Sequence, residues 1–453
     1  MVKLTTINPA TEEKLKTYNA NNVSDIPKYI NNAKKAFSYF SGLSVKERCN
    51  YLKKISSLLL KRKQEYSRLI SLEMGKPIRE SIAEIEKCSW VCDYYAENGE
   101  KFLQDEIIKT EYKKSYIKFQ PLGVIACIMP WNFPFWQVFR FAIPSLTIGN
   151  TIILRHSTQV LGCSEVINDL FNNILPRNTF QNFISTTDAA EKLIQSDING
   201  VSFTGSTNVG RRIGELTGKN IKKFVLELGG SDPFIVLDDA EINFTCESAI
   251  TARFINAGQS CIAAKRFIIH KSKTREFTNK IVNLVKNLKT GNPLDFETNI
   301  GPLVNKKQRD NLEIQVNKSL KQGAKILIGG KKLNRKGYFY MPTVLVNVNN
   351  RMSVIRGEVF GPVMPILIVN SNEDAIKEAN NSEYGLGASL WTKDLKKAEH
   401  YASKIQAGFV SINQIVRSDP RLPFGGIKNS GIGRELSRYG LLEFCNVKSV
   451  VIK

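Results

Sequence analysis

The chain has 453 residues, and 64 lysines and arginines against 42 aspartates and glutamates give it a formal net charge of +22 at pH 7. Hydrophobic residues make up 42% and charged residues 23%, which excludes a disordered or collagen-like chain. Eight cysteines in this length exclude a small disulfide-stapled protein. The excess charge raises nucleic acid, a membrane surface or small acidic molecules as partners.

The N-terminal segment and the cysteines bear on the compartment. The first residues contain no apolar stretch of the kind that a secretory signal has. The most apolar region, 122–154, is interrupted by prolines and Arg140, so it is a poor membrane span. The cysteines form no CxxC pairs and histidines number only 3, so we expect no bound metal. Dispersed thiols favour a reducing compartment, and we expect a cytoplasmic protein without a membrane partner.

The predicted elements begin with a helical region at about 24–104, where apolar residues such as Leu52, Ile55 and Leu59 recur at helical spacing. The segment 123–129 is continuously apolar, which is typical of a strand buried on both faces. Further strands and helices then alternate to the end of the chain. The expected strands are 110–120, 151–154, 200–204, 234–237, 267–269, 326–328, 363–369, 407–412 and 448–453, with helices around 160–173, 274–288 and 306–322. This alternation predicts βαβ units, parallel sheets and an α/β fold class.

Cys261 is the candidate nucleophile. It closely follows Gly258 and small residues, which allow a tight turn that exposes a thiol. Cysteine is the most nucleophilic side chain near neutral pH. No histidine is placed to form a Cys–His pair, so the base has to be a carboxylate or the local electric field. Taken alone, the residue is also compatible with a buried, inert cysteine.

Two other motifs supply a carboxylate and an amide. Glu227 ends a short apolar strand and precedes two glycines, so its side chain is able to turn into a cleft. Asn132 lies between Pro130 and Pro134, which fix the loop around its amide. Such an amide contributes roughly 2.7–4 kcal/mol at a developing alkoxide. Singly, these residues are also compatible with a solvated strand end and an ordinary turn.

Glycine-rich turns complete the set of motifs. Gly205 and Ser206 lead from a predicted strand into a helix, whose N-terminal N–H groups suit a pyrophosphate. The spacing to Gly210 is neither that of the G-x-G-x-x-G fingerprint nor that of a Walker A motif. Two more rigid loops follow, at 358–362 and 423–426.

The order and spacing of these motifs resemble the NAD(P)-dependent aldehyde dehydrogenase superfamily over nearly the whole chain. Both the spacing from Glu227 to Cys261 and that from Cys261 to Glu358 match the family. The resemblance is greatest to the short succinate-semialdehyde dehydrogenase branch. It implies that Cys261 attacks the aldehyde carbon and that Asn132 holds the oxyanion of the thiohemiacetal. Hydride transfer then leaves a thioester, which water activated by Glu227 hydrolyses.

The resemblance also implies an NAD(P) site. Its expected residues are Trp131, Arg155, Ser157, Thr158, Gly205, Ser206, Gly229, Glu358 and Phe360. Among them, Glu358 binds the nicotinamide ribose and Phe360 lies beside the nicotinamide. Arg155 and Thr158 stand where many members have a lysine and a glutamate that hold the adenine ribose. Because a guanidinium suits phosphate and Thr158 does not repel it, we expect NADP, with NAD as the alternative cofactor.

Arg140 and Arg417 are the implied substrate ligands. Arg140 matches a position at the substrate entrance where succinate-semialdehyde dehydrogenases bind the distal carboxylate. A second family arginine is replaced by Ile255, and Arg417 is the candidate for its role. Phe141 replaces a lysine that many members have on a proton route. We expect succinate semialdehyde as substrate, with a broad range of aliphatic or aromatic aldehydes as the alternative.

A basic nucleic-acid-binding protein is the rival class. The short basic runs lack the aromatic interleaving, helix-turn-helix pattern or zinc spacing of recognition modules, so we expect no specific nucleic acid. A CoA-acylating enzyme fits less well because Glu227 is kept for hydrolysis. An inactive scaffold fits less well because Asn132, Glu227, Cys261 and Glu358 are all present.

The resemblance implies two Rossmann-like parallel-sheet domains and a small β arm for oligomerisation. The expected ranges are 1–105 and 121–226 for the cofactor-binding domain, 227–434 for the catalytic domain, and 106–120 with 435–453 for the arm. Exposed strand edges in the arm suit pairing with another subunit, as a dimer or a tetramer.

Overall fold

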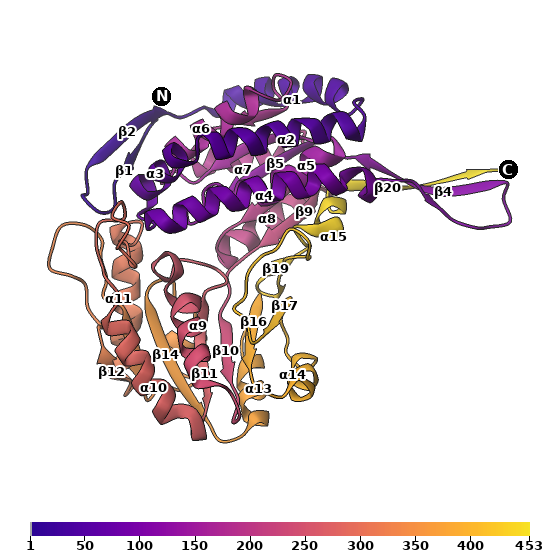
Figure 1. Cartoon of the computed structure of the whole chain (residues 1–453). Helices are drawn as coiled ribbons and strands as arrows, with labels where there is room; N and C mark the ends of the chain where they lie inside the picture. The colour runs from indigo at the N-terminus through magenta and orange to yellow at the C-terminus, as the bar shows by residue number, and fades with distance from the viewer. Residues whose placement is uncertain (1) are drawn as a thin grey trace.

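The computed structural model describes residues 2–453 and contains two large sheets, one above the other in Figure 1, each covered by helices. The predicted α/β class with a small antiparallel arm is confirmed. Within the described residues no helix has the length and apolar character needed to span a membrane.

The first sheet has the strand order β19-β9-β8-β5-β6-β7. Its parallel strands are β5 (Val124–Met129), β6 (Thr151–His156), β7 (Phe180–Asn182), β8 (Gly200–Thr204) and β9 (Lys223–Glu227), and β19 (Gly431–Ile432) is antiparallel to β9. From β7 across to β9, the parallel strands read 3-2-1-4-5 in chain order. This is the order of dinucleotide-binding sheets, in which ligands bind where the order reverses, here beyond the carboxyl ends of β5 and β8.

Eight helices pack around the first sheet. They are α1 (Ile26–Phe40), α2 (Val45–Lys61), α3 (Lys63–Met74), α4 (Ile78–Phe102), α5 (Trp136–Ile148), α6 (Leu161–Asn172), α7 (Thr187–Gln195) and α8 (Thr207–Lys219). Ser44 and Glu47 form a capping box that begins α2. All thirteen residues of α5 are buried, because this helix is apolar around most of its circumference and lies between α4 and the sheet. The carboxyl end of β5 and the start of α5 are therefore held rigidly.

The second sheet has the order β12-β13-β14-β11-β10-β16-β17, with only β12 antiparallel. Its strands are β10 (Asp232–Val236), β11 (Ala264–His270), β12 (Lys325–Ile328), β13 (Thr343–Val346), β14 (Val363–Val369), β16 (Gly387–Trp391) and β17 (Phe409–Ile412). Its helices are α9 (Ile242–Phe254), α10 (Lys271–Lys286), α11 (Lys306–Lys321), α12 (Ser353–Arg356), α13 (Asn372–Asn380) and α14 (Leu395–Ala402). The link 228–231 joins β9 to β10, so the two sheets meet near Glu227.

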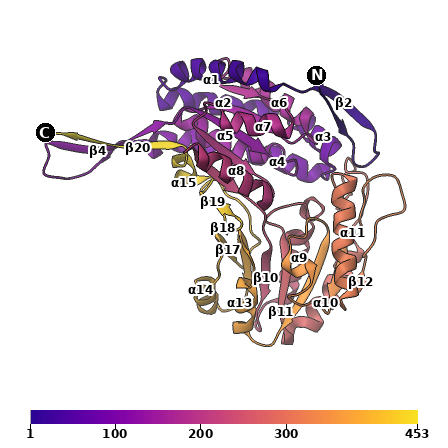
Figure 2. The ribbon, with the colours of Figure 1, turned by 180° about the vertical axis from the view of Figure 1, so that it is seen from behind.

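A third sheet projects from the body of the molecule, as both views show (Figures 1 and 2). Its order is β20-β4-β3, with β3 (Glu106–Ile107), β4 (Lys114–Pro121) and β20 (Cys445–Ile452). Short α15 (Ser437–Leu442) precedes β20 and packs on α5. The remaining small pairs are β1 (Lys3–Ile7) with β2 (Lys14–Asn19), and β15 (Tyr384–Gly385) with β18 (Ile427–Lys428). The domain boundaries stay a prediction, and β19, within 227–434, adds an edge to the first sheet.

Candidate active site

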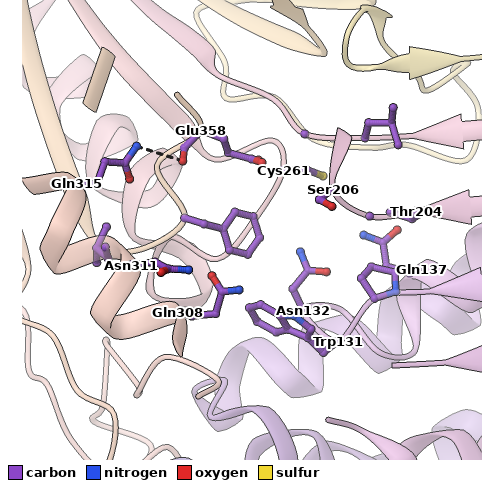
Figure 3. Close-up of a pocket in the computed structure, with 16 residues that line it drawn as sticks. Trp131, Asn132, Gln137, Thr204, Ser206, Cys261, Gln308, Asn311, Gln315 and Glu358 are labelled. Atoms are coloured by element: carbon purple, nitrogen blue, oxygen red, sulfur yellow. Dashed lines mark hydrogen bonds between the residues drawn. The ribbon is translucent and has the colours of Figure 1, made fainter. Parts of the chain in front are cut away.

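Two cavities meet at Cys261. One has a volume of about 330 Å³ and is named the amide cavity here for its five side-chain amides: Asn132, Gln137, Gln308, Asn311 and Gln315 (Figure 3). The other has a volume of about 300 Å³ and is named the cation cavity for its three cations: Lys87, Arg140 and Arg417. Cys261 lines both cavities, so its thiol has access to two different bound molecules.

The turn before Cys261 has an unusual backbone. Asn256, Ala257 and Gly258 all have positive φ, at 50°, 52° and 74°. Positive φ is costly for non-glycine residues and persists where the surroundings fix it. Here the Asn256 side-chain amide donates to the carbonyl of Asn132 over 2.9 Å, which ties the turn to the loop after β5. The sequence predicted a tight turn from Gly258, and the structure shows that it begins two residues earlier.

Two buried cations tie this turn to the Glu358 loop. Arg253 donates to the backbone carbonyls of Gly258, Ala264, Val359 and Gly361. Lys265 Nζ donates to the carbonyls of Ser260, Cys261 and Ala263. The same ammonium lies 3.6 Å from Glu358 Oε1, so one cation contacts both the nucleophile turn and a predicted cofactor ligand. Sequence reasoning missed both residues, although Lys265 and Arg266 are adjacent cations at the start of a strand whose centre is apolar.

The Asn132 loop is anchored from α4. The Glu84 carboxylate accepts the backbone N–H groups at the start of α5, both over 2.9 Å. Asn132 Nδ2 donates to the carbonyl of Gln259 over 3.1 Å. An amide nitrogen has two N–H groups, so one remains for an acceptor in the cavity. Asn132 is therefore fixed where an oxyanion donor for Cys261 chemistry is needed, as the two prolines of its loop predicted.

Glu227 lies at the end of β9 but lines neither cavity in this conformation. Its side chain is 2% exposed, and neither carboxylate oxygen has a hydrogen-bond donor among the described residues. Arg140 Nη2 lies 3.9 Å from Glu227 Oε2, and the same guanidinium forms a closer ion pair with buried Glu435. Burial raises the pKa of Glu227 well above its usual range, and Arg140 opposes that rise. The predicted substrate ligand Arg140 thus already faces two carboxylates, one of which the sequence did not single out.

The environment of Cys261 keeps the thiol protonated at rest. Burial raises its pKa to about 11, while the nearby cations Arg140 and Lys265 act to lower it. No histidine of residues 2–453 lines either cavity. Formation of the thiolate therefore depends on these two cations and on how bound molecules alter the electrostatic environment of Cys261.

Six of the nine predicted cofactor residues line the amide cavity. They are Trp131, Gly205, Ser206, Gly229, Glu358 and Phe360. The rings of Trp131 and Phe360 meet edge to face with centroids 5.7 Å apart. A Cβ at Gly229 would lie 2.6 Å from Glu358 Oε2, so a larger residue there would displace the Glu358 carboxylate. Ser206 is the N-cap of α8, where backbone N–H groups attract a phosphate.

The other three predicted cofactor residues lie outside that cavity, at the end of β6. Because Met129 of β5 pairs with His156 of β6, the turn with Ser157 and Thr158 lies beside the loop that carries Trp131. Arg155 Nη2 donates to the carbonyl of Ser185 over 3.2 Å. These residues border the same edge of the sheet, which is where an extended dinucleotide would continue.

Helix α11 contributes a face that sequence reasoning missed. Gln308, Asn311 and Gln315 recur at i, i+3 and i+7, so they share one face of the helix, and Figure 3 shows them directed into the amide cavity. Gln315 Nε2 also donates to the backbone carbonyl of Glu358 over 3.4 Å. Amides at helical spacing on a predicted helix were the available signal.

A model of the aldehyde dehydrogenase family matches residues 2–450 of the chain. The chain belongs to the aldehyde dehydrogenase family. It is 42% identical to a probable succinate-semialdehyde dehydrogenase [NADP(+)] of Synechocystis sp., over 99% of both chains. It is also 42% identical to succinate semialdehyde dehydrogenase [NAD(P)+] Sad of Escherichia coli, over 98% of this chain and 96% of the other. The predicted resemblance is confirmed.

Solved structures agree with this assignment. The succinic semialdehyde dehydrogenase of Streptococcus pyogenes, solved in complex with NADP+, matches with a TM-score of 0.97 and 33% identity over 99% of each chain. A structure described as giving insight into cofactor and substrate selection by Gox0499 matches with a TM-score of 0.98 and 36% identity over both whole chains. The roles of individual site residues in this aldehyde dehydrogenase stay predictions, and geometry is the support for each.

Proposed function

We propose that this aldehyde dehydrogenase oxidises succinate semialdehyde to succinate, with NADP as the preferred cofactor and NAD as the alternative. The observation that carries the proposal is the cation cavity, which joins Cys261 to three positively charged side chains in a space suited to a small aldehyde. An aldehyde with an anionic far end matches that arrangement. The names of the relatives from Synechocystis sp. and Escherichia coli support the same substrate.

The chain's own residues provide the covalent chemistry. The Cys261 thiol releases its proton to solvent as Sγ bonds to the aldehyde carbon, and the carbonyl oxygen takes the negative charge. The free N–H of Asn132 and the backbone N–H of Cys261 stabilise that oxyanion. Ser206 and Glu358 would hold the cofactor in the amide cavity, where it would supply the hydride acceptor. Loss of hydride from the carbon leaves a thioester on Cys261.

Glu227 has to move before it acts on this thioester. In its buried position it has no hydrogen-bond donor and a raised pKa, so it holds a proton there. We infer that the side chain of Glu227 turns toward Cys261 and releases its proton to solvent as it leaves the buried position. The resulting carboxylate then removes a proton from the attacking water. Arg140 remains behind as the counter-charge, held by Glu435.

The preference for NADP is attributed to the end of β6. Arg155, Ser157 and Thr158 present a guanidinium and two hydroxyls at this edge and no carboxylate, a donor set that suits a 2′-phosphate. The structure of the Streptococcus pyogenes relative with NADP+ supports the same cofactor.

Self-association is proposed through the projecting three-stranded sheet. Ile107 is 68% exposed and Val447 is 54% exposed on this arm, and exposed apolar residues on open strands favour pairing with another subunit. A dimer and a tetramer are both compatible with one such arm, and sedimentation velocity distinguishes them.

A cytoplasmic location stays a prediction, supported by eight free cysteines.

A panel of aldehydes tests the proposed function. Succinate semialdehyde and butanal have the same carbon chain and differ in the distal carboxylate, and each is assayed with NADP and with NAD. We expect kcat/KM for succinate semialdehyde with NADP to exceed that for butanal by at least about tenfold. Equal values would favour the broad-specificity alternative, and a tenfold advantage of NAD would overturn the cofactor preference.

A further inference from the structure

Lys87, on α4, is a cation that the sequence did not mark and the mechanism does not use. Its side chain lines the cation cavity, which also contains Cys261. Nζ lies 4.3 Å from the centre of the Trp136 ring and donates to Ser418 Oγ over 2.7 Å. Within residues 2–453, no carboxylate lies within 4.0 Å of this ammonium. It is therefore oriented, partly desolvated and without an ion-pair partner.

The three cations of the cavity differ in what they already bind. Arg140 faces both Glu227 and Glu435, and its guanidinium stacks on Phe424 at 4.7 Å. Its charge is therefore balanced before any substrate arrives. Arg417 is exposed at the cavity wall without an ion pair among the described residues. Lys87 and Arg417 are the two whose charge is not yet matched.

Lys76 provides a comparison within the same region. Its ammonium also lies against an aromatic ring, 3.6 Å from the centre of Phe133, but it is fully buried and paired with Glu84. The charge of Lys76 is therefore matched by Glu84, and Lys76 lines neither of the two cavities. Lys87 has the same aromatic support but a hydroxyl in place of a carboxylate. An ammonium has three N–H donors, so donors remain for a ligand.

The acidic residues of the cation cavity are engaged elsewhere. Glu84 pairs with Lys76 and accepts two backbone N–H groups of α5. Glu80 accepts the backbone N–H of Asn256 over 2.7 Å. Asp232 accepts the N–H of Gly387 over 3.1 Å. None of them neutralises Lys87, although all three contribute to the wall.

We propose that Lys87 is a specificity-determining residue that binds the distal carboxylate of the substrate, with Arg417 as the second ligand. The inference rests on the proposed function and adds the residue that binds the distal carboxylate of the substrate. Binding replaces water at the ammonium with a carboxylate in a partly apolar cavity, where such a charge-assisted hydrogen bond is strong. Arg140, whose charge Glu435 already offsets, lines the same cavity and contributes less to this contact.

The charge of Lys87 provides an independent readout. Burial, followed by Arg140, lowers its pKa to about 8, and Arg417 acts in the same direction. Above that pH the amine becomes neutral and carboxylate binding weakens. The titratable and charged groups that face it are Glu80, Glu84 and Cys88 on α4, Arg140 on α5, Asp232 on β10, Cys261, and Arg417 with Asp419 on the loop after β17. Burial raises the pKa of Glu80 and Asp232 to about 7. Their titration therefore affects the pH profile of KM at a lower pH than that of Lys87.

The experiment compares Lys87→Met with Lys87→Arg in the full chain, with Lys101→Met on the exposed end of α4 as a control. We expect Lys87→Met to raise KM for succinate semialdehyde at least about tenfold and to leave kcat/KM for butanal within about twofold. Lys87→Arg should recover most of the affinity. In the wild type, KM for succinate semialdehyde divided by KM for butanal should rise as the pH passes through about 8. This pH-dependent rise should vanish in Lys87→Arg.

The outcomes separate this inference from the proposed function. Equal losses with both aldehydes, or no change with either, would overturn the role of Lys87, whatever the wild-type preference. If the wild type does not prefer succinate semialdehyde, the proposed substrate is wrong, and another aldehyde with a distal carboxylate, such as glutarate semialdehyde, replaces it in the same comparison. An Arg140→Ala variant that loses affinity for succinate semialdehyde alone, while Lys87→Met does not, would assign the carboxylate to Arg140 instead.

Discussion

The two cavities that meet at Cys261 recognise their contents by different means. Glu358 is the one charged side chain on the wall of the amide cavity, whose other polar groups are neutral amides, hydroxyls and backbone at glycines. The cation cavity combines three cations and three acids with apolar side chains such as Phe133, Trp136 and Ile262. A long polar cofactor suits many weak, directional donors, whereas a small anion needs a few unmatched charges. The net charge of +22 does not explain ligand recognition in either cavity. Recognition of an anion depends on which cation in the cavity lacks an ion-pair partner.

Cys261→Ala should have the largest effect, because this residue belongs to both cavities. Without the nucleophile no thiohemiacetal forms, and we expect kcat to fall on the order of 10⁴-fold or more with any aldehyde. NADP binding, followed by quenching of intrinsic tryptophan fluorescence, should be preserved. Residual activity above a tenth of wild type would refute the assignment of the nucleophile.

Asn132→Ala should follow in size. Loss of one oxyanion donor is expected to reduce kcat by about 10²–10³-fold. The reduction should be the same for succinate semialdehyde and butanal, since the amide acts on the reacting oxygen and not on the distal end. Steady-state assays with both aldehydes measure this. A loss confined to one aldehyde would place Asn132 in substrate selection instead.

Local sequence patterns predicted the residues of the amide cavity better than those of the cation cavity. Trp131, Ser206 and Glu358 lie in rigid turns next to strands, and turn chemistry is visible in a short stretch of sequence. Lys87 lies mid-helix on α4, and nothing local distinguishes it from exposed lysines on the same helix. The pairing of Arg140 with Glu435 joins α5 to the segment before α15, so only the folded chain shows that Arg140 is already matched. Arg155 was placed correctly at a strand end, but its distance from the amide cavity depends on the packing of β6.

Lys265 contacts both Cys261 and Glu358, and its replacement tests whether the nucleophile and the amide cavity are coupled. Lys265→Met removes a cation beside Cys261 that lowers the pKa of the thiol, so that pKa should rise. The pH dependence of iodoacetamide alkylation measures this shift, which a purely structural role would not produce. Since Glu358 loses its ion pair, KM for NADP should also rise. Lys265→Arg should recover part of both effects, and an unchanged alkylation profile in Lys265→Met would contradict the link.

Thr158→Glu should have the smallest effect and acts only at the far end of the cofactor. The new carboxylate would repel a 2′-phosphate near Arg155, and we expect kcat/KM for NADP to fall roughly tenfold, or about 1.4 kcal/mol. The value for NAD should stay within about twofold, because its ribose carries hydroxyls that accept a carboxylate neighbour. Thr158→Gln has nearly the same shape without the charge and is the matched control. If Thr158→Gln lowers the NADP value as much as Thr158→Glu, then space and not charge governs this edge. If neither changes the ratio of the two cofactors, the turn after β6 does not contact the ribose, and Arg155 remains to be tested by Arg155→Met in the same assay.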